Sequence, residues 1–156
     1  MSMSATSILS KKSLMRFNAR DLDAQALLAR AREEATEIFS KESTRRGRTL
    51  NTITETCLYG HSAELYLISQ HGFKDDQRPY KDLYDTSGNS VEVKVTEGSY
   101  YVPYVLKRLN EAKQQTWRNF PDIAYIFIGD KKTYEYELDG IYHWNETLNR
   151  FTKQRN

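Results

Sequence analysis

A turn-rich stretch near the middle of the chain, Asp85-Thr86-Ser87-Gly88-Asn89, separates two strand-like runs at residues 79–84 and 90–95. Side chains alternate between two faces along a β-strand, and alternate positions of these runs are apolar: Leu83, Val91, Val93 and Val95. The pattern predicts a β-hairpin with one face buried in a core. The chain therefore has to fold around a sheet.

Charged side chains occupy the other face of this predicted hairpin. If an odd-length loop centred on Ser87 closes it, Asp82 lies opposite Glu92, and Tyr80 lies opposite Lys94. Two carboxylates this close repel each other unless a cation lies between them. Oxygen ligands without a nearby His or Cys favour Mg²⁺, with Mn²⁺ as a substitute. An adjacent ammonium can orient a water and oppose the charge that develops on a phosphate, so the pattern predicts metal-dependent phosphodiester hydrolysis.

The site depends on the length of the loop. A two-residue loop at Ser87-Gly88 would shift the register by one residue and move Asp82 to the face opposite Glu92. Asp85 lies at the mouth of the turn and competes with Asp82 for the role of metal ligand. We expect Asp85 to cap the turn with its carboxylate, as Asp often does.

The order of these elements resembles the PD-(D/E)xK nuclease superfamily over residues 59–130. The resemblance rests on Asp82, on Glu92-Val93-Lys94 in a strand, and on Glu64 in the preceding helix. It implies that Asp82, Glu92 and Glu64 ligate Mg²⁺ and that Lys94 assists the attacking water. Lys81 stands where the name of the motif has proline, a departure that is common in the superfamily. Independently of the resemblance, Glu64 could lie at the edge of an apolar helix stripe and reach solvent.

The fold class predicted from the whole chain is α/β, with a central mixed β-sheet flanked by helices. The resemblance adds a restriction-endonuclease-like core at about residues 58–130. Residues 1–20 are predicted as a loosely ordered arm and residues 21–156 as a single domain. The predicted elements are a helix from Asp21 or Asp23 to about Lys41, the Glu64 helix ending at Gly72, a helix from about residue 104 to 117, and strands at 122–128, 133–138 and 141–144, the last two separated by a turn at Asp139-Gly140.

Two basic sets could bind the phosphates of a nucleic acid. Arg45, Arg46 and Arg48 lie in a connection between two predicted helices, where a solvated linker is the alternative. The second set follows the Glu92 strand on a helix, where an ordinary solvated face is the alternative: Lys107, Arg108, Lys113 and Arg118. The tyrosine-rich segment at residues 98–104 could stack on bases or pack in the core.

Composition limits the class of protein. The chain has 156 residues, 38% of them hydrophobic and 12% aromatic, which predicts one globular domain. No apolar run reaches the length of a membrane span, so we expect a soluble, cytoplasmic protein without a membrane partner. The single Cys57 excludes an internal disulfide and favours a small buried hydrophobe. His61 is predicted as a polar residue at a helix start.

The predicted function is a Mg²⁺-dependent DNA endonuclease, with a restriction or homing type that cuts at specific sites favoured. The alternatives are a nuclease specific for junctions or branched DNA, a catalytically inactive DNA-binding module, and a small interaction protein whose charged hairpin face is only solvated. A duplex has two strands, and the chain has one predicted centre. Double-strand cleavage would therefore need a homodimer or a larger symmetric oligomer, for which the N-terminal helix is a candidate interface.

Overall fold

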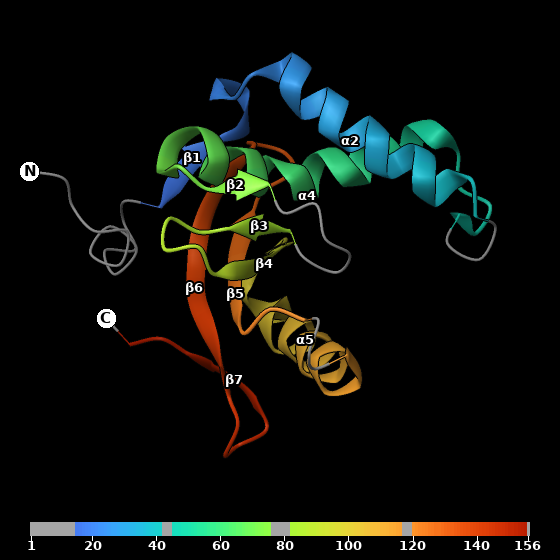
Figure 1. The fold of residues 1–156 in the computed structure, drawn as a ribbon. Coiled ribbons are helices and arrows are strands. Elements are labelled where there is room, and N and C mark those ends of the chain that lie inside the picture. The colour runs from blue at the N-terminus through green and yellow to red at the C-terminus, as the bar shows by residue number, and fades with distance from the viewer. Residues whose placement is uncertain (1–14, 42–44, 76–81, 117–119, 156) are drawn as a thin grey trace, which may run out of the picture.

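The computed structural model of the chain describes residues 15–41, 45–75, 82–116 and 120–155. Within these ranges, seven strands form one sheet in the order β1-β6-β5-β4-β3-β2, with β7 also paired to β6 (Figure 1). The strands are β1 (Arg16–Asn18), β2 (Lys74–Asp75), β3 (Leu83–Tyr84), β4 (Ser90–Thr96), β5 (Ile123–Gly129), β6 (Glu135–Asn145) and β7 (Arg150–Lys153). Strands β4 and β5 run parallel and the other pairs are antiparallel, so the prediction of a mixed sheet is confirmed.

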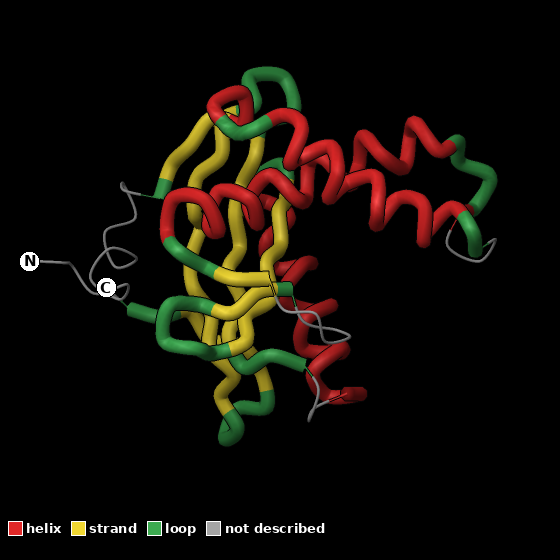
Figure 2. Tube along the Cα trace, turned by 45° about the horizontal axis from the view of Figure 1, so that its top comes forward, coloured by secondary structure: helices red, strands yellow, loops and turns green. Residues whose placement is uncertain are grey.

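Helices cover both faces of the sheet (Figures 1 and 2). They are α2 (Ala24–Phe39), α4 (Leu50–His71) and α5 (Val102–Thr116). Helix α4 packs its Ala63 and Leu67 into the main core, and α5 packs Val102 and Leu109 against the opposite face. Helix α2 packs on α4 through small residues and forms a helical arm with it, which extends beyond the sheet (Figure 2).

The predicted boundaries of α2 and of the end of α4 are confirmed by their caps. Asp23 precedes α2, and its carboxylate accepts hydrogen bonds from the backbone N–H groups of Gln25 and Ala26. Gly72 follows α4 in the left-handed conformation, with φ of 72°, which glycine adopts without steric cost.

The β3–β4 hairpin has the register predicted from an odd-length loop. Leu83 pairs with Val91 and Tyr84 pairs with Ser90, so Asp82 faces Glu92 across the hairpin. The apolar face is buried in the main core as predicted, although Val95 is only partly buried. Tyr80 and Lys81 lie outside the described residues.

Asp85 closes the turn of this hairpin. Its Oδ1 accepts hydrogen bonds from the backbone N–H groups of Ser87, at 3.0 Å, and Asn89, at 2.8 Å. The prediction that Asp85 has a structural role in the turn is therefore confirmed.

The prediction of a loose arm is wrong for residues 15–20. Strand β1 pairs with β6, and Met15 is fully buried beneath it. Phe17 stacks between Tyr66 and Tyr136, with ring centroids 4.1 and 4.7 Å away. An apolar pair at Met15 and Phe17, separated by one residue, supplies the buried face of an edge strand. Residues 1–14 lie outside the described part of the chain.

The predicted turn at Asp139-Gly140 is also wrong, because β6 continues through it as one strand. The pairing with β5 shifts between Ile126 and Phe127, which leaves Asp139 as the extra residue of a β-bulge. Asp139 is buried and accepts a hydrogen bond of 2.7 Å from the Tyr142 hydroxyl. A Cβ at Gly140 would lie 2.5 Å from Cε of Lys153. The glycine is therefore needed to make space for the Lys153 side chain, and it does not mark a turn.

The predicted Glu64 helix, α4, begins at Leu50. Thr49 caps it by accepting a hydrogen bond from the N–H of Thr52. His61 consequently lies in the middle of α4, and the prediction that it starts a helix is wrong. Within the described residues, no helix is long and apolar enough to cross a bilayer.

Candidate active site

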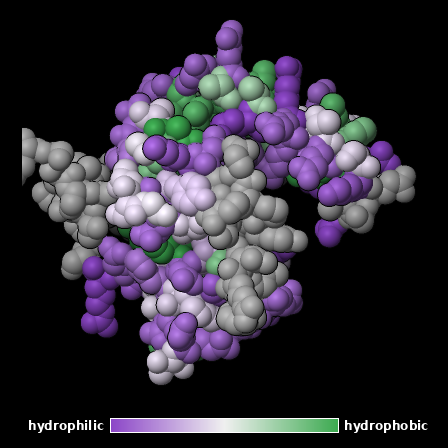
Figure 3. All heavy atoms as spheres, in the orientation of Figure 1, coloured by the Kyte–Doolittle hydropathy of each residue, from purple (hydrophilic) through white to green (hydrophobic). Residues whose placement is uncertain are grey.

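An open groove of about 950 Å³ lies between the helical arm, the outer edge of β4 and the start of α5. Figure 3 shows the surface hollowed between the arm and the part of the molecule below it. Strand β3 begins at Leu83. Among the described residues, the edge of β4 beyond Val91 therefore has no neighbouring strand.

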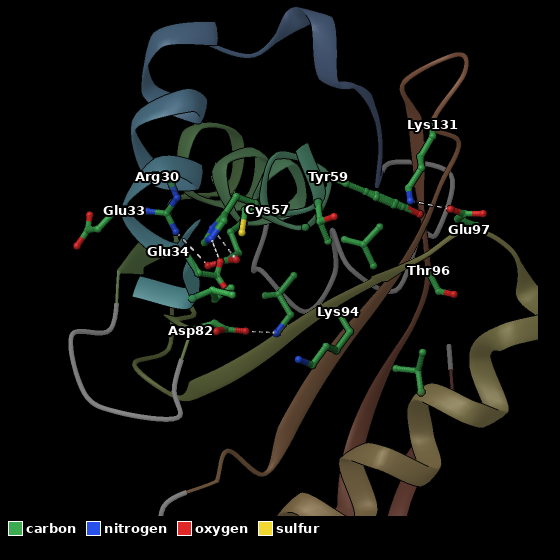
Figure 4. Close-up of a pocket in the computed structure, with 18 of the residues that line it drawn as sticks. Arg30, Glu33, Glu34, Cys57, Tyr59, Asp82, Lys94, Thr96, Glu97 and Lys131 are labelled. Carbon is green, nitrogen blue, oxygen red and sulfur yellow. Dashed lines mark hydrogen bonds and ion pairs between the residues drawn. The ribbon is translucent and has the colours of Figure 1, made fainter. Parts of the chain in front are cut away.

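Asp82 lies at this edge, directly before β3. Its Oδ2 accepts a hydrogen bond of 2.9 Å from the backbone N–H of Val93, a donor that a longer β3 would have paired (Figure 4). The Glu92 side chain is 8% exposed, and its carboxyl is within hydrogen-bonding reach of Asp82. We call Asp82 and Glu92 the acidic pair.

The acidic pair resists carrying two charges. Burial raises the pKa of Asp82, and the nearby charge of Glu64 raises it further. Burial also raises the pKa of Glu92 well above its usual value, and the neighbouring carboxylate of Asp82 adds to this. Folding places two carboxyls side by side at a cost that a bound cation would relieve.

Lys94 supplies part of the missing positive charge. Its Nζ lies 3.3 Å from Oε1 of Glu92, and its side chain is 48% exposed. Loss of hydration lowers the pKa of Lys94, but the charges of Glu92 and Asp82 outweigh this and raise it, so the ammonium stays charged. The structure therefore brings together Asp82, Glu92 and Lys94, as the hairpin pattern predicts.

The donor atoms of the acidic pair fit a hard divalent cation. Both residues offer carboxylate oxygens, and among the described residues the half-exposed Lys94 is the one cation that contacts them. In the part of the chain that the structure describes, no three side chains of His, Cys, Asp or Glu are grouped closely enough to hold a metal ion. The pair alone would supply two ligands, and water or substrate would supply the others.

Glu64 belongs to a second group of charges on the wall of the groove. Its Oε1 lies 3.0 Å from Nη2 of Arg30, whose Nη1 lies 2.7 Å from Asp75. Its Oε2 lies 3.0 Å from Nδ1 of His61, close enough for an ion pair but not aligned as a hydrogen bond. The other ring nitrogen of His61 contacts Glu34. We call these five residues the charge network.

Each carboxylate of the charge network faces a cation. Burial alone would lower the pKa of His61, but its contacts with Glu34 and Glu64 outweigh burial and raise it to about 10. His61 is therefore charged at neutral pH. The hydrogen bond with His61 in turn lowers the pKa of Glu34, against the effect of burial.

Glu64 is buried, so the alternative that it reaches solvent at the edge of its helix is wrong. It lies close enough to the acidic pair to raise the pKa of Asp82. Both of its oxygens are held by Arg30 and His61, however, and the structure does not group it with Asp82 and Glu92 as a third ligand.

Sequence reasoning missed three members of the charge network: Arg30, Glu34 and Asp75. Arg30 and Glu34 are one helical turn apart on α2, and this spacing places both on one polar face. That face contacts the groove instead of solvent alone. Only the pairing of α2 with α4 could have shown this, because no local motif links Arg30 to Glu64 or Asp75.

Cys57 lies on α4 beside Ala31 and Ile53, and its burial confirms the prediction of a small hydrophobe. Burial raises the pKa of the Cys57 thiol to about 11, and the charge of Glu34 contributes. The thiol stays protonated at neutral pH and is a poor nucleophile.

The first basic set lies away from the acidic pair. Arg45, Arg46 and Arg48 follow α2 at the end of the helical arm that points away from the sheet (Figure 1). The guanidinium of Arg45 lies 5.1 Å from the ring centroid of Phe39. The structure does not bring this set into the groove.

The members of the second basic set differ in their surroundings. Lys107 and Arg108 are exposed on α5, and Arg108 lies beside Tyr104, a residue that lines the groove. The assignment of Lys113 to nucleic-acid binding is wrong, because its buried Nζ donates to the carbonyl of Phe120 and pairs with Asp122, both at 2.7 Å. Lys113 fixes the end of α5 to the sheet. Arg118 lies outside the described residues.

Comparison with known proteins gives no relative. No protein-family model matches the chain, and a search of curated proteins finds no similar sequence. The interpretation of the groove therefore rests on its own chemistry.

Proposed function

We propose that the chain is a divalent-metal-dependent deoxyribonuclease that hydrolyses phosphodiester bonds within DNA. The observation that carries the proposal is the position of Asp82, Glu92 and Lys94. Two carboxyls that resist ionisation and one ammonium converge at the edge of β4, where Asp82 and Lys94 line an open groove and Glu92 is buried beside them. The resemblance to the PD-(D/E)xK superfamily, with its restriction-endonuclease-like core, supports the same chemistry.

The residues of the chain divide the work. Asp82 and Glu92 would hold Mg²⁺, or Mn²⁺ in its place. When bound, such an ion acts as a Lewis acid on the phosphate and lowers the pKa of its water. The Lys94 ammonium donates hydrogen bonds toward that water or toward a phosphoryl oxygen, where negative charge develops during the reaction. The peptide N–H of Val93 fixes the orientation of Asp82 through their 2.9 Å hydrogen bond.

Glu64 has a conditional role. Its oxygens contact Arg30 and His61, at 3.0 Å in each case. It would contribute an oxygen to the cation or to its water only by giving up part of these contacts. Glu64 therefore supports the site from the wall of the groove and is the weakest of the proposed ligands.

The choice of DNA comes from the family resemblance. Arg45, Arg46, Arg48, Lys107 and Arg108 are candidate phosphate contacts, and Arg108 lies beside Tyr104, which lines the groove. A restriction or homing type that cuts both strands needs two copies of the chain, because the described residues hold one such centre. A nuclease specific for branched DNA can act with one centre on one strand.

The test is cleavage of plasmid DNA, branched DNA and RNA by the purified protein, with Mg²⁺, with Mn²⁺ and with neither. We expect DNA cleavage that depends on the metal. We also expect it to fall by a factor of about 100 or more in Lys94→Ala, because correct placement of a proton or water typically contributes that much. The matched control is Lys132→Ala, which removes an exposed lysine from the β5–β6 turn.

Circular dichroism of both variants checks that the fold is retained. Metal-dependent cleavage that survives in Lys94→Ala contradicts the assignment of the site. DNA binding without cleavage in either metal would favour the inactive binding module, and the absence of both activities would favour the interaction protein.

A further inference from the structure

Three exposed tyrosines gather directly after β4. Tyr100 is 83% exposed, Tyr101 is 48% exposed and Tyr104 is 60% exposed, although large aromatic side chains are usually buried in a domain of this size. The rings of Tyr100 and Tyr101 meet edge to face, with centroids 5.0 Å apart. Among the described residues, no hydrogen bond or core contact accounts for these rings.

Two of these tyrosines line the groove of the acidic pair. Tyr101 and Tyr104 form its wall at the start of α5, and β4 forms the floor from Val93 to Thr96. Figure 4 shows this floor, with Lys94 and Thr96 on β4 and Glu97 at its end. A chain laid along β4 would therefore pass from the tyrosines to Lys94 and Asp82.

Arg108 extends the tyrosine wall by one helical turn. Its guanidinium carbon lies 5.8 Å from the ring centroid of Tyr104. Arg108 is exposed, and no carboxylate of the described residues lies within ion-pairing distance of it. This cation is available to an anionic ligand.

The charge of the groove restricts what the ligand can be. Among the described residues that line it, seven carboxylates stand against four cations. A polyanion is not drawn into this groove by net charge. Base stacking on tyrosine does not depend on charge, and it is worth about 1–3 kcal/mol per base. A ligand with aromatic planes joined by phosphates fits both the tyrosines and Arg108.

We propose that Tyr101, Tyr104 and Arg108 bind unpaired nucleotides of a DNA strand, with bases stacked on the tyrosines and a phosphate on Arg108. The inference rests on the proposed function and names its substrate class. The substrate carries a single-stranded part, as a free strand or as the splayed end of a branched duplex. A fully paired duplex cannot present its base faces to these rings.

The test measures binding by fluorescence anisotropy, without divalent metal so that no cleavage occurs. The probes are a short oligothymidine, an abasic oligonucleotide with the same number of phosphates, and a duplex of the same length. We expect the double variant Tyr101→Ala/Tyr104→Ala to weaken oligothymidine binding by a factor of about 10 to 100, from the stacking energy of one to two bases. The double variant Tyr101→Phe/Tyr104→Phe keeps the rings and should retain most of the affinity.

The abasic probe separates stacking from charge. We expect it to bind weakly to the wild type and to be unaffected by either tyrosine variant, while Arg108→Ala weakens the binding of all three probes. If the alanine variant binds the abasic probe and oligothymidine with equally reduced affinity, the tyrosines do not stack on bases and the inference is wrong. It is also wrong if the duplex binds the wild type as tightly as oligothymidine does.

This experiment and the cleavage assay fail in different ways. If binding depends on the tyrosines but the protein cuts no DNA with Mg²⁺ or Mn²⁺, the proposed binding site is supported and the proposed nuclease activity is wrong. If the alanine variant cleaves duplex DNA as fast as the wild type, the nuclease activity is supported and the proposed binding site is wrong. Preferred cleavage of branched over fully paired DNA by the wild type, reduced in the alanine variant, supports both.

Discussion

Asp82 of the acidic pair borders the same groove as the charge network, yet the carboxylates of the two groups are matched with cations very differently. In the charge network, Glu64 lies between Arg30 and His61, and Asp75 shares the same guanidinium. In the acidic pair, Asp82 and Glu92 lie next to each other, and of the cations in the described part of the chain the half-exposed Lys94 alone lies beside them. One group of charges is neutralised by the fold, and the other is left short of positive charge.

The difference indicates where a ligand belongs. Buried carboxylates that are fully paired contribute to structure, and a ligand would have to compete for them. Buried carboxyls with raised pKa values cost folding free energy and mark a functional site. The charge network therefore forms part of the wall of the groove, and under the proposed function the acidic pair is where the cation binds.

The largest contrast should be in catalysis. Asp82→Asn keeps the shape of the side chain and the hydrogen bond from Val93 but removes a metal-binding charge, so we expect cleavage to fall by a factor of about 1,000 or more. Glu34→Gln changes the charge network instead and should cost less than about tenfold. Single-turnover cleavage at saturating Mg²⁺ measures both. Equal losses in the two variants would mean that the two groups of charges do not differ in function.

The next contrast is in stability. Arg30→Met removes the cation that Glu64 and Asp75 share, which leaves the buried Glu64 with His61 alone and takes the ion pair away from Asp75. We expect a loss of about 2–3 kcal/mol in the free energy of unfolding, reduced from the value for a fully buried pair because Asp75 is partly exposed. Urea unfolding measures it, with Arg32→Met as the control on the exposed face of α2. A loss no larger than in the control would show that the network does not stabilise the fold.

The acidic pair should respond in the opposite direction. Asp82→Asn removes the repulsion in the pair, so without metal we expect the protein to become more stable by about 1–2 kcal/mol. Increasing Mg²⁺ should then stabilise the wild type by mass action and leave the variant almost unchanged, and the thermal unfolding temperature of each protein measures this. A variant that is less stable than the wild type without metal would show that the pair is already satisfied by Lys94 and its hydrogen bonds.

The acidic pair could be predicted from sequence, and the charge network could not. A hairpin is local, and the alternation of Leu83 and Val91 with charged residues fixes which side chains face each other. The contact of Arg30 with Asp75 joins residues 45 positions apart, and it depends on how α2 lies on α4. No period or motif encodes such a contact.

The errors in the sequence interpretation have related causes. Asp139-Gly140 does mark an irregularity, but the same residues suit a turn and a β-bulge, and the pairing with β5 decides between them. Lys113 has the spacing of an exposed basic residue on α5, and only the return of the chain to Phe120 and Asp122 buries its ammonium. In each case a residue far along the chain determines the outcome.

The smallest contrast is in the pH dependence of stability. The pKa of His61 is about 10 in the folded protein and about 6.5 when unfolded, so the folded state binds the proton more tightly. Its contribution to stability is complete below about pH 6.5 and is lost as the pH rises toward 10. Because Glu34 is half exposed, we expect that loss to be no more than about 1 kcal/mol.

Urea unfolding of the wild type and of His61→Gln at several pH values between 6 and 10 isolates this contribution, because other groups titrate equally in both proteins. The difference in stability between the two proteins should shrink steadily over this range. A constant difference would mean that His61 does not hold its proton through Glu34 and Glu64. Glu34 would then lack its cation, and Arg30 alone would neutralise Glu64 and Asp75, so the contrast between the two groups would be weaker.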